Sequence, residues 1–196
     1  MLFSGRLKKR KGIMEAVNIS LKAEKKMKFA GSISMDETDQ NYFNSDVMSK
    51  INNNKHLIEY HGFIPRDKIG TFYGSSKLTL FPIQWEEPFG LVMIESMATG
   101  TPVIGFARGS VAEVIRDGET GFIINPSADD IRGNWIIKKT GIEGMIEAVK
   151  RIYSMPEAEY SNMRRNCRKH VEENFSIKHM VDEYEKAYNK ILSKRK

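Results

Sequence analysis

Cysteine is almost absent from this sequence, and so are long apolar runs. Cys167 is the only cysteine among 196 residues, which excludes an intrachain disulfide and favours a reducing compartment. No stretch approaches the roughly 18 apolar residues that cross a membrane, and no secretory signal pattern is present. We therefore expect a cytoplasmic protein. The 40% hydrophobic and 29% charged residues are typical of a globular domain.

Acidic residues are in the minority. Against 31 Lys and Arg there are 25 Asp and Glu, so the net charge is +6. This balance suits phosphorylated ligands or an anionic membrane surface, and peripheral attachment to the inner face of a membrane stays open. Nucleic acid is disfavoured as a partner because no basic stripe interleaved with aromatic residues appears.

Apolar runs that suit strands alternate with helical patterns through residue 125. Strands are expected within 1–7, 27–33, 56–64, 78–82, 102–106 and 121–124, with helices at 12–23, 42–51, 67–75, 88–99 and 111–115 between them. The first run has a sharp glycine exit, the second strand ends in Gly31, and the third run leads into a loop. Beyond this point three helices follow, at 142–153, 157–173 and 177–192, before a basic tail, 194–196, that is most simply solvated. The alternation predicts an α/β fold: a doubly wound, Rossmann-like parallel sheet with extra C-terminal helices, all in one domain, 1–196.

The stretch from Phe81 to Pro102 carries the strongest chemical signal. A strand that ends at Pro82 leads into a polar, aromatic loop and then into a helix that we place from Pro88, a residue suited to the first helical position. Gly90 falls in the first turn of that helix, where the missing side chain leaves backbone N–H groups open to a ligand. A helix start just after a strand is a ready anion site.

Two carboxylates frame this helix start. Glu87 and Glu95 are eight residues apart, which corresponds to roughly 12 Å if the whole interval is helical. That spacing suits two hydroxyl-rich groups joined by a phosphate bridge. Two solvated acids near a helix start explain it as well, since the helix dipole favours them there. On spacing alone the second explanation is the stronger.

A basic loop, residues 6–12, separates the first strand from the first helix. Arg6 and Lys11 are suited to charge-assisted hydrogen bonds to a phosphate, although a solvated basic turn explains them equally well. Arg6, Ile64, Glu87 and Gly109 each follow a predicted strand. Because ligands bind at the carboxyl ends of the strands in such sheets, one cleft can hold them all. No residues with metal-ligand spacing surround His61.

The sequence Glu-Pro-Phe-Gly-Leu-Val-x-x-Glu, followed by Ser-Met-Ala-x-Gly-x-Pro-Val-Ile, closely resembles the signature of the retaining, GT-B-fold glycosyltransferases of family 4 (glycosyl transferases, group 1). The resemblance covers nearly the whole chain. It implies the C-terminal, donor-binding half of an enzyme that moves a sugar from a nucleoside-diphosphate sugar to an acceptor with retention. The N-terminal acceptor-binding domain is absent from this sequence, so we expect little or no transfer by this chain alone.

The resemblance also implies roles for the charged residues. Glu87 would meet the hydroxyls of the donor sugar and is the catalytic candidate, although it need not act as a nucleophile, and Glu95 would meet the ribose. Arg6 and Lys11 match residues that grip the donor diphosphate. With the helix N-terminus they would supply the positive charge that a cation supplies elsewhere, so no metal or other cofactor is expected.

The rest of the implied site is made by loops. Phe63 and Ile64 match the loop whose backbone meets the nucleobase. Gly109 and Ser110 match a loop near the donor sugar, although a flexible connector explains them equally well. The complete donor-binding set is Arg6, Lys11, Phe63, Ile64, Glu87, Phe89, Gly90, Leu91, Val92 and Glu95.

Other functions stay open. One is a non-catalytic module that binds a nucleotide sugar or phosphate. Another is a protein-interaction domain on a degenerate fold, which fits poorly with four intact charged residues at the expected positions. An epimerase of sugar nucleotides matches the central motif less well. The sequence does not identify the base (uridine, guanosine or adenosine), the sugar or the acceptor. Family resemblance alone suggests polysaccharide synthesis for the cell envelope.

Overall fold

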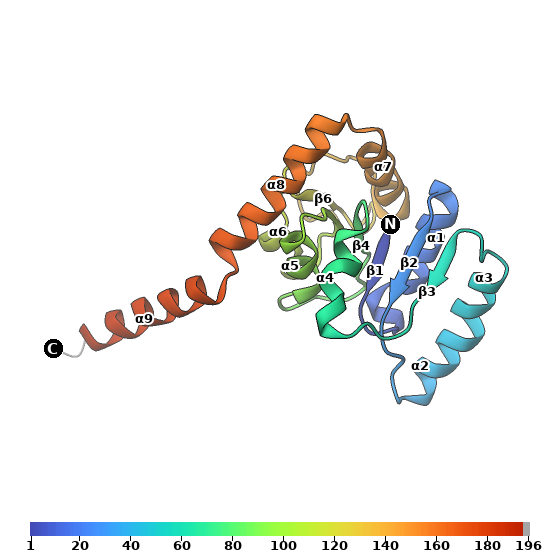
Figure 1. The fold of residues 1–196 in the computed structure, drawn as a ribbon, viewed down its shortest axis with the longest axis horizontal. Coiled ribbons are helices and arrows are strands. Elements are labelled where there is room, and N and C mark those ends of the chain that lie inside the picture. Colours follow the sequence, from blue (N-terminus) through green and yellow to red (C-terminus); the bar gives the residue numbers. More distant parts are fainter. Residues whose placement is uncertain (194–196) are drawn as a thin grey trace.

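The computed structural model describes residues 1–193; the basic tail predicted at 194–196 lies outside the described residues. In the described part, six parallel strands form one sheet in the order β3-β2-β1-β4-β5-β6 (Figure 1). The strands are β1 Leu2–Ser4, β2 Met27–Ala30, β3 Ile58–Tyr60, β4 Thr79–Phe81, β5 Val103–Phe106 and β6 Gly121–Ile124. The chain builds outward in one direction from β1 and then, from β4, in the other.

Helices follow the strands and cover both faces of the sheet. Their bounds are α1 Ile13–Ala23, α2 Glu37–Asn41, α3 Met48–Asn52, α4 Arg66–Gly74, α5 Leu91–Ala98, α6 Val111–Val114, α7 Gly141–Ser154, α8 Glu157–Asn174 and α9 Ile177–Ser193. A π-helical segment, Tyr42–Val47, joins α2 to α3, and a 3₁₀ turn, Lys9–Lys11, precedes α1. Helix α1 packs against α7, while α5 packs against α4 and α8.

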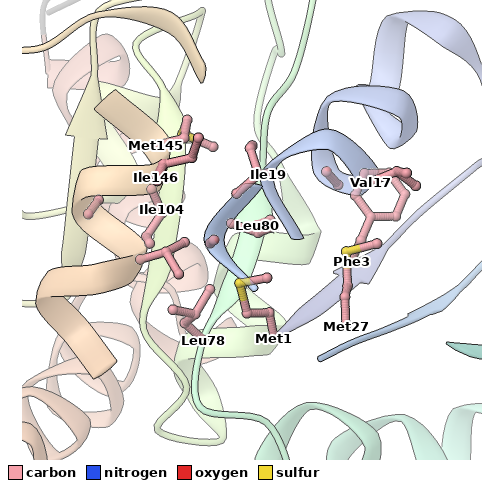
Figure 2. Packing of buried hydrophobic residues seen from close by; sticks show 14 of the residues in the cluster. Met1, Phe3, Val17, Ile19, Met27, Leu78, Leu80, Ile104, Met145 and Ile146 are labelled. Atoms are coloured by element: carbon pink, nitrogen blue, oxygen red, sulfur yellow. The ribbon is translucent and has the colours of Figure 1, made fainter. Parts of the chain in front are cut away.

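The core is divided by the sheet because successive strand residues point to opposite faces. Leu80 and Ile104 belong to the cluster that includes α1 and α7, where Met145 and Ile146 lie nearby (Figure 2). Their sequence neighbours Phe81 and Val103 belong instead, with Ile123 of β6, to the cluster that includes α5 and α6. Strands buried on both faces are continuous apolar runs, as the sequence shows. The predicted doubly wound parallel sheet is confirmed.

The start of α5 differs from the prediction. The helix was expected from Pro88, but it begins at Leu91 with Gly90 as its N-cap at φ 81°, in the left-handed region. A Cβ on Gly90 would lie 2.3 Å from Cε of Met93, so glycine alone allows this turn without rearrangement. The interval between Glu87 and Glu95 is therefore not wholly helical, and the spacing that assumed a helix does not apply.

The strands are shorter than the runs in which they were predicted. The first strand ends at Ser4, just before the predicted glycine exit, and the third spans only Ile58–Tyr60 of the run 56–64 that was expected to lead into a loop. Both runs leave the sheet where a glycine takes a backbone conformation outside the strand region, at Gly5 and Gly62. The residues beyond these glycines become loops at the carboxyl edge of the sheet, where they are free to form a site.

The three C-terminal helices are confirmed as α7, α8 and α9. Helix α8 turns Met163 and Val171 inward, as predicted. Helix α9 extends away from the body of the domain, and none of its described residues is buried (Figure 1). Among residues 1–193, no helix combines the length and apolar character needed to span a membrane.

Candidate functional site

A cavity of about 400 Å³ opens at the carboxyl edge of the sheet, between the ends of β1 and β4. These two strands are neighbours although the chain forms β2 and β3 between them, so the strand order reverses here. Doubly wound sheets bind ligands at such a reversal. The lining comes from Phe3–Arg6 at the end of β1 and just beyond it, from Lys11, from Phe81 at the end of β4, and from Trp85 and Glu87–Val92 beyond β4.

Lys11 and Glu87 form an ion pair in the wall of this cavity. Lys11 Nζ lies 2.6 Å from Glu87 Oε2, and the side chains are only 16% and 12% exposed. Gly12 brings the two loops together: its φ is 82°, and a Cβ there would lie 2.0 Å from the backbone oxygen of Pro82. The close approach of the basic loop to the exit of β4 therefore requires glycine, and it places the Lys11 ammonium beside Glu87.

Trp85 completes this cluster, and the sequence analysis did not assign it a role. Its indole Nε1 donates to Glu87 Oε2 at 3.0 Å. The guanidinium of Arg10 and the ammonium of Lys11 lie over its ring, 4.5 Å and 4.7 Å from the centroid. The one available signal was a tryptophan two residues before the candidate carboxylate, in an otherwise polar loop.

The N-terminus of α5 forms another side of the cavity. Gly90, Leu91 and Val92 all line it, and the first N–H groups of a helix have no acceptor within the helix. These groups and the helix dipole favour an anion here. Arg6, which is exposed, lines the same cavity. The structure thus brings a helix start and two basic side chains to one space.

The residues that were predicted to contact the base line a neighbouring cavity. Phe63 and Ile64 line a second cavity of about 180 Å³, and Ser4 and Gly5 line both cavities. Phe63 is 75% exposed. The two cavities are therefore adjacent at the end of β1. Arg6 and Lys11 line the first, and Phe63 and Ile64 line the second.

Glu95 is not brought into either lining. It lies within α5, where one carboxylate oxygen accepts a hydrogen bond from the Tyr73 hydroxyl at 3.2 Å. Tyr73 is fully buried, and burial, together with the nearby Glu95 charge, raises the pKa of its hydroxyl. Sequence analysis missed Tyr73, because nothing in its helical pattern distinguishes it from an ordinary core residue.

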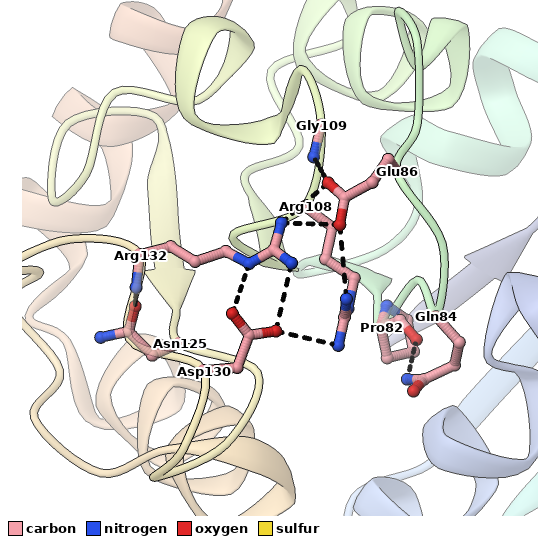
Figure 3. A network of polar contacts seen from close by, with 8 residues as sticks. All are labelled: Pro82, Gln84, Glu86, Arg108, Gly109, Asn125, Asp130 and Arg132. Carbon is pink, nitrogen blue, oxygen red and sulfur yellow. Dashed lines mark hydrogen bonds and ion pairs between the residues drawn. The ribbon is translucent and has the colours of Figure 1, made fainter.

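Glu86, the neighbour of Glu87, does not line the cavity and belongs instead to a network of polar contacts at the surface (Figure 3). The Gly109 N–H donates to Glu86, and Arg132 Nη1 lies 2.7 Å from Glu86 Oε1. Arg132 also pairs with Asp130 at 2.7 Å. The hydrogen bond from Arg132 is the main cause that holds the pKa values of both carboxyl groups below their ordinary range. The loop that contains Gly109 thus holds, from outside the cavity, the loop between β4 and α5 that carries Glu86 and Glu87, which we call the motif loop.

No cluster of metal-ligating type appears in residues 1–193: no three His, Cys, Asp or Glu side chains converge closely enough to hold an ion. His61, at the end of β3, lies 3.2 Å from Glu59. The cavity itself is lined by two cationic side chains, a carboxylate, an indole and the N-terminus of α5.

Comparisons with known proteins agree on a family. The model of the family described as glycosyl transferases group 1 matches residues 1–134. The N-acetyl-alpha-D-glucosaminyl L-malate synthase of Bacillus anthracis is 30% identical over 128 residues, which are 65% of this chain and 29% of that protein. The chain thus spans less than a third of this relative.

Solved structures share the fold. Anabaena HepE, solved in complex with UDP and glucose, superposes with a TM-score of 0.77 at 15% identity over 96% of this chain and 48% of its own. The C-terminal domain of a glycosyl transferase group 1 family protein from Francisella tularensis has a TM-score of 0.71 at 19% identity, covering 90% of this chain and 86% of that one.

The family match runs from β1 past β6 and includes every residue that lines the cavity. It covers well over half of the chain. The protein therefore belongs to the glycosyl transferases group 1 family.

Proposed function

We propose that this chain is the donor-binding half of a retaining glycosyltransferase that moves a sugar from a nucleoside-diphosphate sugar to an acceptor. The acceptor-binding half would come from further sequence or from a separate chain. The partial coverage of the relatives supports this division, since the chain spans 48% of HepE while matching almost the whole of an isolated C-terminal domain.

The observation that carries the proposal is the composition of the cavity at the strand-order reversal. Arg6, Lys11 and the start of α5 face one space, and together they offer charge-assisted and backbone donors for a diphosphate. Glu87 lies in the same wall and is suited to accept hydrogen bonds from sugar hydroxyls. The cavity beside Phe63 and Ile64 would take the base, and because the loop backbone would make this contact, the identity of the base is open.

Glu95 would bind the ribose in this proposal, although it lies outside both linings. Its carboxylate is held by Tyr73 from inside the domain, so the remaining oxygen is available to a ligand that extends past the start of α5. Transfer would need no metal, because Arg6, Lys11 and the α5 N-terminus would neutralise the leaving diphosphate. Binding that persists in excess chelator is the expected result; loss of binding would contradict metal independence.

The test is calorimetric titration of the chain with UDP, GDP and ADP and with their sugar conjugates. One nucleotide should bind saturably. Lys11→Ala should weaken its binding about tenfold or more, since a hydrogen bond to a charged group is lost. Glu95→Ala should weaken it too, by removing a ribose contact. Failure of all three nucleotides to bind, both to this chain and to the full-length reading frame, would overturn the proposal.

Adjacent carboxylates provide a matched control. Glu87→Gln should weaken the sugar conjugate more than the free diphosphate, because only the conjugate carries the hydroxyls that Glu87 would accept from. Glu86→Gln, one residue earlier and outside the cavity, should leave both affinities unchanged. Equal losses in the two variants would show that the motif loop, rather than the Glu87 carboxylate, is being disturbed.

Transfer itself is to be measured on the full-length reading frame. The anomeric configuration of the product, followed by NMR from the start of the reaction, should match that of the donor. An inverted product would refute retention while leaving donor binding intact.

We further propose that the acceptor is a polysaccharide of the cell envelope, which transfer to such acceptors would test. We also propose that the protein works at the inner face of the membrane, which sedimentation with vesicles would test.

A further inference from the structure

Trp85 contacts three charged groups at once, and the proposed function gives it no part. Its half-buried side chain lies in the loop between β4 and α5. The indole Nε1 donates to Glu87 Oε2 at 3.0 Å. The ring face lies under Lys11 Nζ and the Arg10 guanidinium, at 4.7 Å and 4.5 Å from the centroid. One rigid side chain thus joins the candidate sugar-binding carboxylate to the basic loop.

The backbone holds the same two loops in register. The N–H of Gln84 donates to the backbone oxygen of Arg10 at 2.9 Å, directly beside the indole. The residue before Trp85 is therefore tied to the basic loop, which places the indole beside Arg10 and Lys11. A tryptophan is suited to this place because its ring attracts cations while its N–H remains available to an anion at the ring edge.

The two oxygens of the Glu87 carboxylate have different contacts. Oε2 receives both Lys11 Nζ at 2.6 Å and the indole N–H. In residues 1–193 no donor reaches Oε1, which leaves that oxygen for a ligand. A diphosphate in the cavity would compete for the Lys11 ammonium. The indole N–H would then be the contact that still holds Oε2, and with it the direction of Oε1.

We propose that Trp85 is a positioning residue of the donor site: its N–H orients Glu87 toward the donor sugar, and its ring holds the Lys11 ammonium in place for the diphosphate. The inference rests on the proposed donor binding. The proposal gives Trp85 two contributions, and different ligands measure them. The indole N–H should affect only binding of the donor sugar, through Glu87, whereas the ring should affect binding of any nucleoside diphosphate, through Lys11.

Two variants separate these contributions. Trp85→Phe keeps an aromatic face and removes the N–H, so it should weaken binding of UDP-glucose about tenfold while UDP binding changes less than about twofold. Trp85→Leu removes both and should weaken UDP as well. GDP with GDP-mannose, or ADP with ADP-glucose, replaces this pair if the parent prefers that base. The same calorimetric titrations give all the values.

A matched control is Trp135→Phe. Trp135 is the other tryptophan; it packs against the same apolar cluster as Trp85, and its buried Nε1 has no hydrogen-bond partner among the described residues. Its replacement should leave both ligands bound as in the parent. In that variant Trp85 is the sole tryptophan, and its fluorescence should change when UDP binds the Lys11 ammonium that lies over its ring. An unchanged emission spectrum at saturating UDP would overturn the ring-face role.

A purely structural role for Trp85 predicts a different result. Trp85→Phe would then lower the melting temperature and weaken UDP and UDP-glucose equally, or would change neither. A double-mutant cycle sharpens the distinction: in Glu87→Ala, where the acceptor is gone, Trp85→Phe should have no further effect on the UDP-glucose to UDP affinity ratio. A persisting effect would overturn the proposal. If the parent binds neither ligand, donor binding fails first, and the role of Trp85 falls with it.

Discussion

Two adjacent carboxylates, Glu86 and Glu87, occupy opposite environments on the two sides of one loop. The Glu87 side chain is 12% exposed and pairs with Lys11 inside the cavity, while the Glu86 side chain is 54% exposed and joins a network on the surface. Both accept hydrogen bonds from neighbouring donors. The inner cluster holds groups suited to a ligand, and the outer network holds the loop that carries them.

The difference shows why counting ion pairs says little about either region. In water, exposed charges gain little from pairing because solvent already stabilises them. Charges withdrawn from water depend on their partners, so removing one partner leaves the other uncompensated. The inner pair should therefore be sensitive to substitution and the outer network tolerant. Gly109 donates a hydrogen bond to Glu86 and lies against the backbone of Glu87, so its substitution should have a larger effect than a change in either the inner pair or the outer network.

The largest effect is expected from Gly109→Ala. Gly109 has φ +55°, and an added Cβ would lie 2.2 Å from the backbone oxygen of Glu87. The motif loop would have to move, so we expect the free energy of unfolding to fall by about 3 kcal/mol, with weaker nucleotide binding. Urea unfolding at equilibrium measures the first and calorimetry the second.

The control is Gly62→Ala, which separates backbone strain from contact. Gly62 has φ +68°, but a Cβ there meets nothing within 4 Å. It should cost only about 1 kcal/mol, the strain of the left-handed conformation. Similar losses in the free energy of unfolding of the two variants would show that the close contact between Gly109 and Glu87 contributes nothing beyond backbone strain.

The next effect is expected from Lys11→Met, which removes the ammonium and keeps an unbranched side chain. Glu87 would lose its counter-charge in a nearly buried wall, and we expect a loss of about 2 kcal/mol in the free energy of unfolding. This is less than for a fully enclosed pair, because the cavity opens to water. Lys22→Met breaks the exposed pair with Glu143 and should cost less than about 1 kcal/mol. A larger loss in Lys22→Met would refute the contrast.

The smallest effect is expected from Glu86→Gln, and it should depend on pH and salt. Arg132 holds the pKa of Glu86 below its ordinary value of 4.5, so the folded state binds a proton less readily than the unfolded chain. The stabilisation is therefore present above that value and is lost as the pH falls through the folded pKa. Parent and variant should differ by less than about 1 kcal/mol at neutral pH, and by less still in acid or concentrated salt. A difference that grows on acidification would contradict the assignment.

Much of the fold could be predicted, because it depends on patterns within short stretches. The continuous apolar runs that became β4, β5 and β6 could be buried on both faces only in a covered parallel sheet. The amphipathic pattern of residues 142–153 predicted helix α7 in the same way. Strand ends were less predictable, since pairing with a neighbour decides where a strand stops, and that neighbour is distant in sequence.

The candidate site could be predicted only in part. The motif pointed to Glu87, and the basic loop to Arg6 and Lys11, which the structure places around one cavity. Trp85 and Tyr73 were missed because their importance comes from contacts with partners far along the chain. Whether the predicted residues bind a donor stays a prediction until the titrations are made.

The helix start shows the limit most clearly. Pro88 favours a first helical position locally, yet the contact of Gly109 and Ser110 with Glu86 and Glu87 holds this segment as a loop. Local propensity is worth little against several tertiary contacts. The left-handed Gly90 then lets α5 begin three residues later.

By itself the sequence determined the alternation of strands and helices, the position of the motif and the charges available to it, because these depend on residue type and spacing. Tertiary structure decided that Lys11 meets Glu87, that Trp85 lies between Glu87 and the basic loop, and that Glu95 is held by Tyr73 outside the cavity. The physical reason is that burial and pairing depend on which loops meet at the edge of the sheet, and the strand order sets that meeting.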